Sequence, residues 1–156
     1  MILQLQNIDP QRIAAIDSNG DQLAYADITL LSQQISTNIP ERALCFLLVE
    51  NNIGGIAWTM SMLESQQLVP LILNIKTEDS LYQQLLDTYQ PSYICAPSYI
   101  TLKGEVIDSQ FGYQLRKVSD NHCVLHPELS HLLPTSGSTG SPKLVRHKYE
   151  NIEAAG

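Results

Sequence analysis

The segment from Thr135 to Lys143 holds the residue types best suited to bind phosphate groups. It reads Thr-Ser-Gly-Ser-Thr-Gly-Ser-Pro-Lys, so hydroxyl side chains and two glycines precede a proline and a lysine. Glycine lets the backbone approach a ligand closely, and exposed backbone N–H groups form concavities that bind anions. The lysine ammonium adds a compact positive charge, and hydrogen bonds to charged oxygens are the stronger ones. We therefore expect a polyphosphate site formed by Thr135, Ser136, Gly137, Ser138, Thr139, Gly140, Pro142 and Lys143.

This segment differs from the Walker A loop of nucleotide-binding proteins. A Walker A loop has Gly-Lys in direct succession, whereas Ser141 and Pro142 separate Gly140 from Lys143 here. Composition alone favours a plainer alternative, a Ser/Gly-rich surface turn or linker. The apolar lead-in at 132–133 and the Pro-Lys-Leu-Val that follows reduce that preference without reversing it.

The cysteines and histidines suggest no second reactive centre. Cys45 and Cys95 lie in apolar runs and are expected in the core, as reduced thiols of a cytoplasmic protein. Cys123 and His126 are three residues apart, but no second pair at ligand spacing follows, so no metal site is assigned. No nucleophile is paired with a base, so no catalytic residue is assigned either. Surface or turn positions are expected for His122, His126, His131 and His147.

The elements that must position the phosphate-binding segment alternate between strand and helix patterns. A continuous apolar run such as 43–49 is typical of a strand buried on both faces, and apolar residues at helical spacing follow it. Pro70 is expected at the start of the next strand, and the Thr77 hydroxyl is expected to cap the next helix. The predicted order is strand 43–49, helix 51–65, strand 71–74, helix 77–89 and strand 92–96.

This alternation predicts an α/β fold of layered βαβ units, with a mostly parallel sheet flanked by helices. A further helix is expected over 27–39, before the first of these strands. Residues 100–118 are interrupted by Lys103-Gly104 and Phe111-Gly112, which favours a β-hairpin. The sequence shows no internal repeat and no convincing linker, so residues 1–156 are expected to form a single domain.

Composition excludes several classes of partner. Hydrophobic residues make up 44% and charged residues 16%, which is typical of a packed globular core. The net charge of −7 and the lack of a basic cluster argue against nucleic acid and against an anionic membrane surface. The N-terminus lacks the features of a secretory signal, and no apolar run reaches the roughly twenty residues of a membrane-spanning helix.

The segment Thr135–Lys143 resembles the signature of the AMP-forming synthetase superfamily, Thr-Ser-Gly-Ser/Thr-Thr-Gly-x-Pro-Lys-Gly-Val. That superfamily includes acyl- and aryl-CoA ligases, the adenylation domains of nonribosomal peptide synthetases, and luciferases. The resemblance extends upstream to most of the chain. It includes the segments 22–28, 43–74 and 87–97, and Asn151 after the loop.

The resemblance implies an ATP-dependent acid–thiol ligase that works in two steps with Mg²⁺. A small-molecule carboxylic acid is first activated as an acyl-adenylate, and pyrophosphate leaves. Coenzyme A or the phosphopantetheine of an acyl carrier protein then accepts the acyl group. In this family the loop holds the β- and γ-phosphates, so the expected phosphate-binding residues are those of 135–143.

Two departures and one gap qualify the resemblance. Leu144 stands where the family has Gly, which is expected to change only the local packing. Tyr149 stands where the family has His, which leaves open how the acid pocket is shaped. The later motifs of the family, including its catalytic lysine, lie downstream of Gly156. The chain is therefore expected to be an N-terminal fragment that is inactive alone and works with the rest of the ligase. A non-enzymatic phosphate-binding module and a structural domain with a tail linker remain the alternatives.

Overall fold

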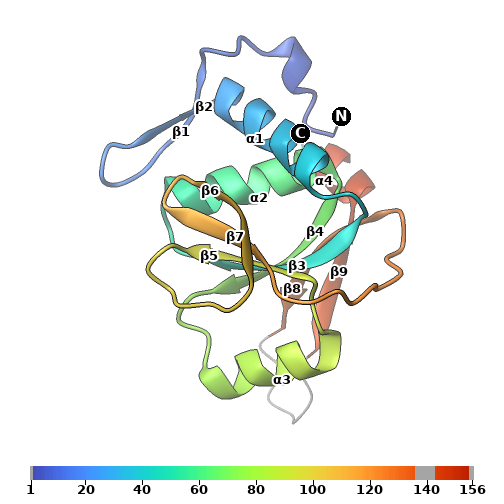
Figure 1. Ribbon diagram of the computed structural model, residues 1–156. Coiled ribbons are helices and arrows are strands. Elements are labelled where there is room, and N and C mark those ends of the chain that lie inside the picture. The colour runs from blue at the N-terminus through green and yellow to red at the C-terminus, as the bar shows by residue number, and fades with distance from the viewer. Residues whose placement is uncertain (1, 136–142, 155–156) are drawn as a thin grey trace.

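The computed structural model describes residues 2–135 and 143–154. A seven-stranded sheet forms its centre, in the order β6-β7-β5-β3-β4-β8-β9, and β1 and β2 form a separate two-stranded sheet (Figure 1). The elements are η1 (Leu5–Asn7), β1 (Ile13–Ile16), β2 (Gln22–Ala24), α1 (Tyr25–Asn38), β3 (Ala43–Val49), α2 (Ile53–Ser65), β4 (Leu68–Asn74), α3 (Asp79–Tyr89), β5 (Tyr93–Pro97), β6 (Glu105–Gln110), β7 (Tyr113–Lys117), β8 (Leu129–Pro134), β9 (Leu144–Lys148) and α4 (Tyr149–Ala154).

The centre of the large sheet is parallel and both flanks are antiparallel. β3 pairs in parallel with β4 and β5, and β4 pairs in parallel with β8 at Leu71↔Leu132. The hairpin β6–β7 extends one side through β5, and β9 extends the other side through β8. The predicted α/β class with βαβ units and the predicted hairpin are therefore confirmed. Phe111 and Gly112, with φ of 54° and 74°, make the tight turn between β6 and β7.

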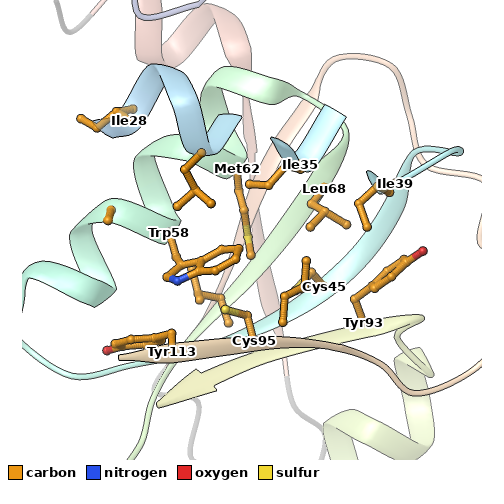
Figure 2. Close-up of a cluster of buried hydrophobic side chains, with 14 of the residues drawn as sticks. Ile28, Ile35, Ile39, Cys45, Trp58, Met62, Leu68, Tyr93, Cys95 and Tyr113 are labelled. Carbon is orange, nitrogen blue, oxygen red and sulfur yellow. The ribbon is translucent and has the colours of Figure 1, made fainter. Parts of the chain in front are cut away.

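Helices cover both faces of the sheet, α1 and α2 on one side and α3 on the other (Figure 1). Successive side chains of β3 point to opposite faces of the sheet. Because both faces are covered, the strand is apolar throughout. Cys45 and Leu47 belong to the cluster under α1 and α2, shown in part in Figure 2. Leu44 and Phe46 belong to the cluster on the other face, which includes Leu85 of α3. Cys45 and Cys95 are both buried free thiols, as expected.

Local polar contacts fix where the helices begin. The Asn52 side chain accepts a hydrogen bond from the Gly55 N–H at 3.0 Å, which caps the first turn of α2. At α1 the Asp27 carboxylate accepts the Ala24 N–H at 2.8 Å. These contacts place the start of each helix directly after a strand or loop, where free N–H groups need acceptors.

Two local expectations were wrong. Pro70 lies inside β4, which begins at Leu68 and has neighbours on both sides, because the pairing with β3 already starts at Ala43↔Leu68. The Thr77 hydroxyl does not cap α3. It donates to the Asn74 carbonyl at 2.6 Å, and Glu78 precedes the helix without a side-chain cap.

Arg42 holds the long connection between β7 and β8 against the sheet. Its guanidinium donates to the carbonyls of Gln66 at 3.2 Å and His126 at 2.9 Å, and also to that of Leu129. Charged donors make the stronger hydrogen bonds, so one side chain fixes the point where β8 begins. No helix within residues 2–135 and 143–154 combines the length and apolar character that crossing a membrane requires.

Candidate functional site

The two ends of the predicted phosphate-binding segment meet in a hairpin. The Thr135 N–H donates to the Lys143 carbonyl at 2.9 Å, and the Thr135 hydroxyl donates to the same carbonyl at 3.0 Å. Directly below, Pro134 of β8 pairs with Leu144 of β9. Both Thr135 and Lys143 are exposed. The other predicted residues, Ser136, Gly137, Ser138, Thr139, Gly140 and Pro142, lie outside the described residues.

Thr135 and Lys143 lie at the edge of the sheet where its parallel strands end. β8 runs parallel to β4, so its last residue, Pro134, is at the same edge as Asn74, the last residue of β4. Ligands of open α/β sheets bind outside the carboxyl ends of the strands. The ends of the segment are therefore at the edge where a ligand site is expected in this class of fold.

A polar network at the same edge follows β3 and β5, and the sequence alone did not reveal it. The buried Tyr113 hydroxyl donates to the Asn52 side chain and accepts the Glu50 N–H, both at 3.0 Å. One Glu50 oxygen accepts from Asn52 at 3.0 Å, and the other accepts from the Tyr99 hydroxyl. The bond to Glu50 raises the pKa of Tyr99 to about 12. Both Glu50 oxygens are hydrogen-bonded, so this network fixes the loops at the edge.

An open groove of about 610 Å³ lies beside Lys143, on the face of the sheet that carries α3. Its apolar lining includes Leu44, Leu132 and Leu144, and its basic side chains are Lys143, Arg146 and His126. Among the described residues that line it there is no carboxylate, although the chain has a net charge of −7. The charges of Lys143 and Arg146 in this lining favour anions over cations.

The histidines occupy two kinds of position. His122 and His126 are exposed in the connection before β8, as expected, and His122 Nδ1 lies 3.1 Å from a Glu41 oxygen. His131 and His147 differ from the expectation of surface positions. They are half-buried cross-strand partners on β8 and β9, and their rings stack with centroids 4.4 Å apart. Burial, and then the charge of His147, lower the pKa of His131.

The residues after the segment close the turn into α4. The Asn151 side chain accepts a hydrogen bond from the Lys148 N–H at 3.0 Å. This bond stabilises the junction between β9 and α4. The Tyr149 N–H donates to the Glu128 carbonyl at 3.0 Å. The Tyr149 hydroxyl is buried and has no hydrogen-bond partner among the residues that the structure describes.

Comparison by sequence finds no relatives. No protein-family model matches the chain, and no curated protein matches it either. Because the signature-like segment is short, the comparison with known proteins rests on the fold.

Solved structures with a similar fold include CoA synthetases and an N-terminal subdomain. o-Succinylbenzoate CoA synthetase (MenE) from Bacillus subtilis, in complex with the acyl-adenylate intermediate OSB-AMP, matches with a TM-score of 0.69 and 15% identity over 96% of this chain. The N-terminal subdomain of Klebsiella oxytoca NpsA matches with a TM-score of 0.67 and 18% identity over 97%. MenE from E. coli with bound OSB-AMS matches with a TM-score of 0.63 and 17% identity over 96%. This chain has the fold of the N-terminal part of AMP-forming synthetases.

The match covers only part of each of these proteins. The chain spans 42% of the Bacillus subtilis and Klebsiella oxytoca chains and 34% of the E. coli chain. The resemblance first seen at Thr135–Lys143 is confirmed at the level of the fold. Activity, substrates and partners of a whole synthetase are a separate question.

Proposed function

We propose that Thr135–Lys143 is the phosphate-binding loop of an ATP-dependent, AMP-forming acid–thiol ligase. The observation that carries the proposal is the hairpin closure of Thr135 on Lys143 at the carboxyl edge of the parallel strands. The fold is that of synthetases solved with acyl-adenylate ligands, which supports a nucleotide at this edge.

The proposed reaction has two displacement steps. A carboxylate oxygen attacks the α-phosphorus of ATP, and pyrophosphate leaves. A thiol sulfur of coenzyme A or of a carrier-bound phosphopantetheine then attacks the acyl carbon, AMP leaves, and the thiol proton passes to solvent. Enzymes of this kind gain rate mainly by positioning and by stabilising charge on the phosphates.

This chain's task in the reaction is to hold the β- and γ-phosphates that leave as pyrophosphate. The Lys143 ammonium and the hydroxyl and backbone donors of 135–140 are the residue types that bind such oxygens. A Mg²⁺ ion would be held largely by the phosphates themselves, as is usual for this ion. The activated acid, the thiol acceptor and the remaining catalytic residues belong to the rest of the ligase.

Replacement of Lys143 tests this proposal. In the intact protein, Lys143→Ala should weaken ATP binding by about 1–3 kcal/mol, because one hydrogen-bonded charge is lost. This corresponds to roughly a 5- to 150-fold rise in Kd, measurable by isothermal titration calorimetry. Lys148→Ala is the matched control, because Lys148 lies on β9 of the same hairpin and its ammonium is near Glu128 and Glu150. Equal affinities of both variants and wild type would contradict the proposed site.

Acid-dependent exchange of pyrophosphate into ATP distinguishes a ligase from a non-enzymatic phosphate-binding module. A ligase incorporates labelled pyrophosphate into ATP only when its acid is present, because the adenylation step is reversible. A phosphate-binding module would bind ATP with the same dependence on Lys143 and show no exchange with any acid tested. Exchange by the intact protein therefore decides between the two.

A further inference from the structure

The rings of His131 and His147 stack across the hairpin that carries both ends of the proposed phosphate-binding segment. They are Cα partners on β8 and β9, and their rings are nearly parallel, with an interplanar angle of 3° and centroids 4.4 Å apart. Both side chains are half-buried, so the rings contact each other and can still exchange protons with solvent. The stack is therefore a contact between the two strands whose strength depends on the protons that the rings hold.

Ser130 holds the His131 ring in this position. The buried Ser130 Oγ lies 3.0 Å from the His147 carbonyl and 2.9 Å from His131 Nδ1. A hydroxyl has one hydrogen, and a carbonyl can only accept, so the serine donates to the carbonyl and accepts from Nδ1–H. The neutral His131 ring therefore carries its proton on Nδ1, and a second proton is added at Nε2. The same hydroxyl joins the ring to the backbone of β9, which keeps the two rings in contact while the hairpin is closed.

The stack is compatible with one positive charge and is opposed by two. Each of two neighbouring like charges disfavours the charged form of the other. Burial, and then the charge of His147, lower the pKa of His131 in the closed hairpin. A solvated imidazole, as in an open hairpin, has a pKa of about 6.5.

These values give the direction of the pH dependence. Below about pH 6.5 the open hairpin binds more protons than the closed one, so a falling pH favours opening. The contribution of the pair to closure is complete well above this pH. It decreases as the pH falls from there to the lowered pKa of His131.

The charged residues of β9 and α4 do not offset the repulsion between the rings. Arg146 and Lys148 alternate with the paired histidine of β9, and successive residues of a strand point to opposite faces of the sheet. The Lys148 ammonium lies 3.6 Å from Glu128 and 3.7 Å from Glu150. The titratable residues of α4 are Tyr149, Glu150 and Glu153.

The elements on the other side of β8 also supply no compensating charge. Strand β4 carries no charged side chain. Helix α2 packs on β4, and the carboxylate of its Glu64 accepts the Leu3 N–H at 2.8 Å. Among the residues that the structure describes, the contacts of up to 4.0 Å between a histidine and a carboxylate involve His122 and His126. The charge of a doubly protonated pair is therefore not neutralised by a direct carboxylate partner within the described part of the chain.

We propose that the stacked pair makes closure of the β8–β9 hairpin sensitive to pH. The hairpin is closed when the pair holds at most one added proton and is loosened when it holds two. Because this hairpin brings Thr135 against Lys143, mildly acidic pH loosens the base of the segment between them. The consequence for phosphate binding rests on the proposed function, whereas the effect on the hairpin does not.

The test is amide hydrogen exchange of the intact protein between about pH 7.5 and pH 5, corrected for intrinsic exchange. Relative to the amides of β3, the equilibrium constant for opening of the β8 and β9 amides should rise by about tenfold, because the open hairpin binds up to one more proton. His131→Gln should abolish this rise, and His147→Gln should reduce it, because burial still acts on His131. His126→Gln should leave it unchanged. The same rise in all three variants, or no rise in the wild type, would overturn the proposal.

A second measurement does not depend on how the variants fold. In the wild-type protein, the ring NMR signals of His131 and His147 should report two separate protonation steps, because the two titrations are coupled. A single common step at the pH of a free imidazole would contradict the proposal.

Neither measurement uses a phosphate ligand, so their outcome is separate from that of the ligase proposal. If both fail while Lys143→Ala still weakens ATP binding, the pH dependence is wrong and the phosphate-binding segment stands. If both succeed while Lys143→Ala has no effect, the hairpin is pH-sensitive and the phosphate assignment is wrong.

Discussion

Gly54→Ala should destabilise the protein by about 2 kcal/mol or more, although alanine is the better helix former. A Cβ at this position of α2 would lie 2.3 Å from Tyr113 Cε1 and 2.4 Å from the Phe111 carbonyl oxygen. Overpacking of this kind costs about 1–3 kcal/mol and occasionally more, whereas the gain in helix propensity is about 1 kcal/mol. The measurement is the free energy of unfolding in urea.

The neighbours of Gly54 cannot move at low energetic cost. The overpacking cost of this substitution should therefore lie at the upper end of its usual range. One contact is a backbone carbonyl in the turn between β6 and β7, and the other is a buried ring. The Tyr113 hydroxyl is bonded at 3.0 Å to both Asn52 and Glu50, so a shift of the ring breaks the polar network at the carboxyl edge. Gln33→Ala, at an exposed position of α1, is the control and should change stability by less than about 0.5 kcal/mol. A stabilised Gly54→Ala variant would show that the packing described here is wrong.

Trp58→Ala should cost about 3–5 kcal/mol, the range for truncating a buried aromatic side chain. Trp58 is fully buried in the cluster between α1, α2 and the sheet, near Met62, Cys95 and Tyr113 (Figure 2). Its Nε1–H donates to the Gln110 carbonyl at 3.0 Å, so truncation also leaves that carbonyl without its donor. Unfolding followed by circular dichroism gives the value, because the only tryptophan of the chain is removed.

Trp58→Phe separates packing from hydrogen bonding. It keeps most of the apolar ring and loses the indole N–H, so it should cost clearly less than Trp58→Ala. The lost hydrogen bond to the part-buried Gln110 carbonyl should cost about 1 kcal/mol. A loss below about 1 kcal/mol for Trp58→Ala would mean that this cluster is not the main core.

The central strands and helices could be predicted because buried elements have a recognisable pattern of apolar residues in the sequence. The run at 43–49 is apolar at every position, and β3 is covered on both faces by separate clusters. Helix α2 lies within the predicted range 51–65, and the hairpin of 100–118 was signalled by Phe111-Gly112 at its turn. In each case a local pattern and the final environment agree.

The features that were missed depend on pairings between distant residues. Pro70 was expected at a strand start, since the sequence does not tell that β4 gains three earlier residues by pairing with β3. His131 and His147 are separated by the phosphate-binding segment, and only the hairpin β8–β9 brings their rings together. The network of Glu50, Asn52, Tyr99 and Tyr113 likewise joins residues from three separate parts of the sequence.

The phosphate-binding role of residues 135–143 stays a prediction, and the structure describes only the two ends of this segment. The prediction came from the small hydroxyl residues, the glycines and the lysine, together with the resemblance to the synthetase signature. The place of these two ends at the carboxyl edge required the parallel pairing of β8 with β4 and the closure of Thr135 on Lys143. The pairing of β8 with β4 has no signal in the local sequence, because the two strands are far apart along the chain.

Titration of the ¹⁵N-labelled protein with pyrophosphate tests the central claim most directly, because the leaving group itself is the probe. The backbone amide signals of residues 135–143 should shift most, with a common midpoint, and Lys143→Ala should move that midpoint to higher pyrophosphate concentration. Shifts centred on another part of the chain, or a midpoint unchanged by Lys143→Ala, would contradict the assignment of this segment as the phosphate-binding loop.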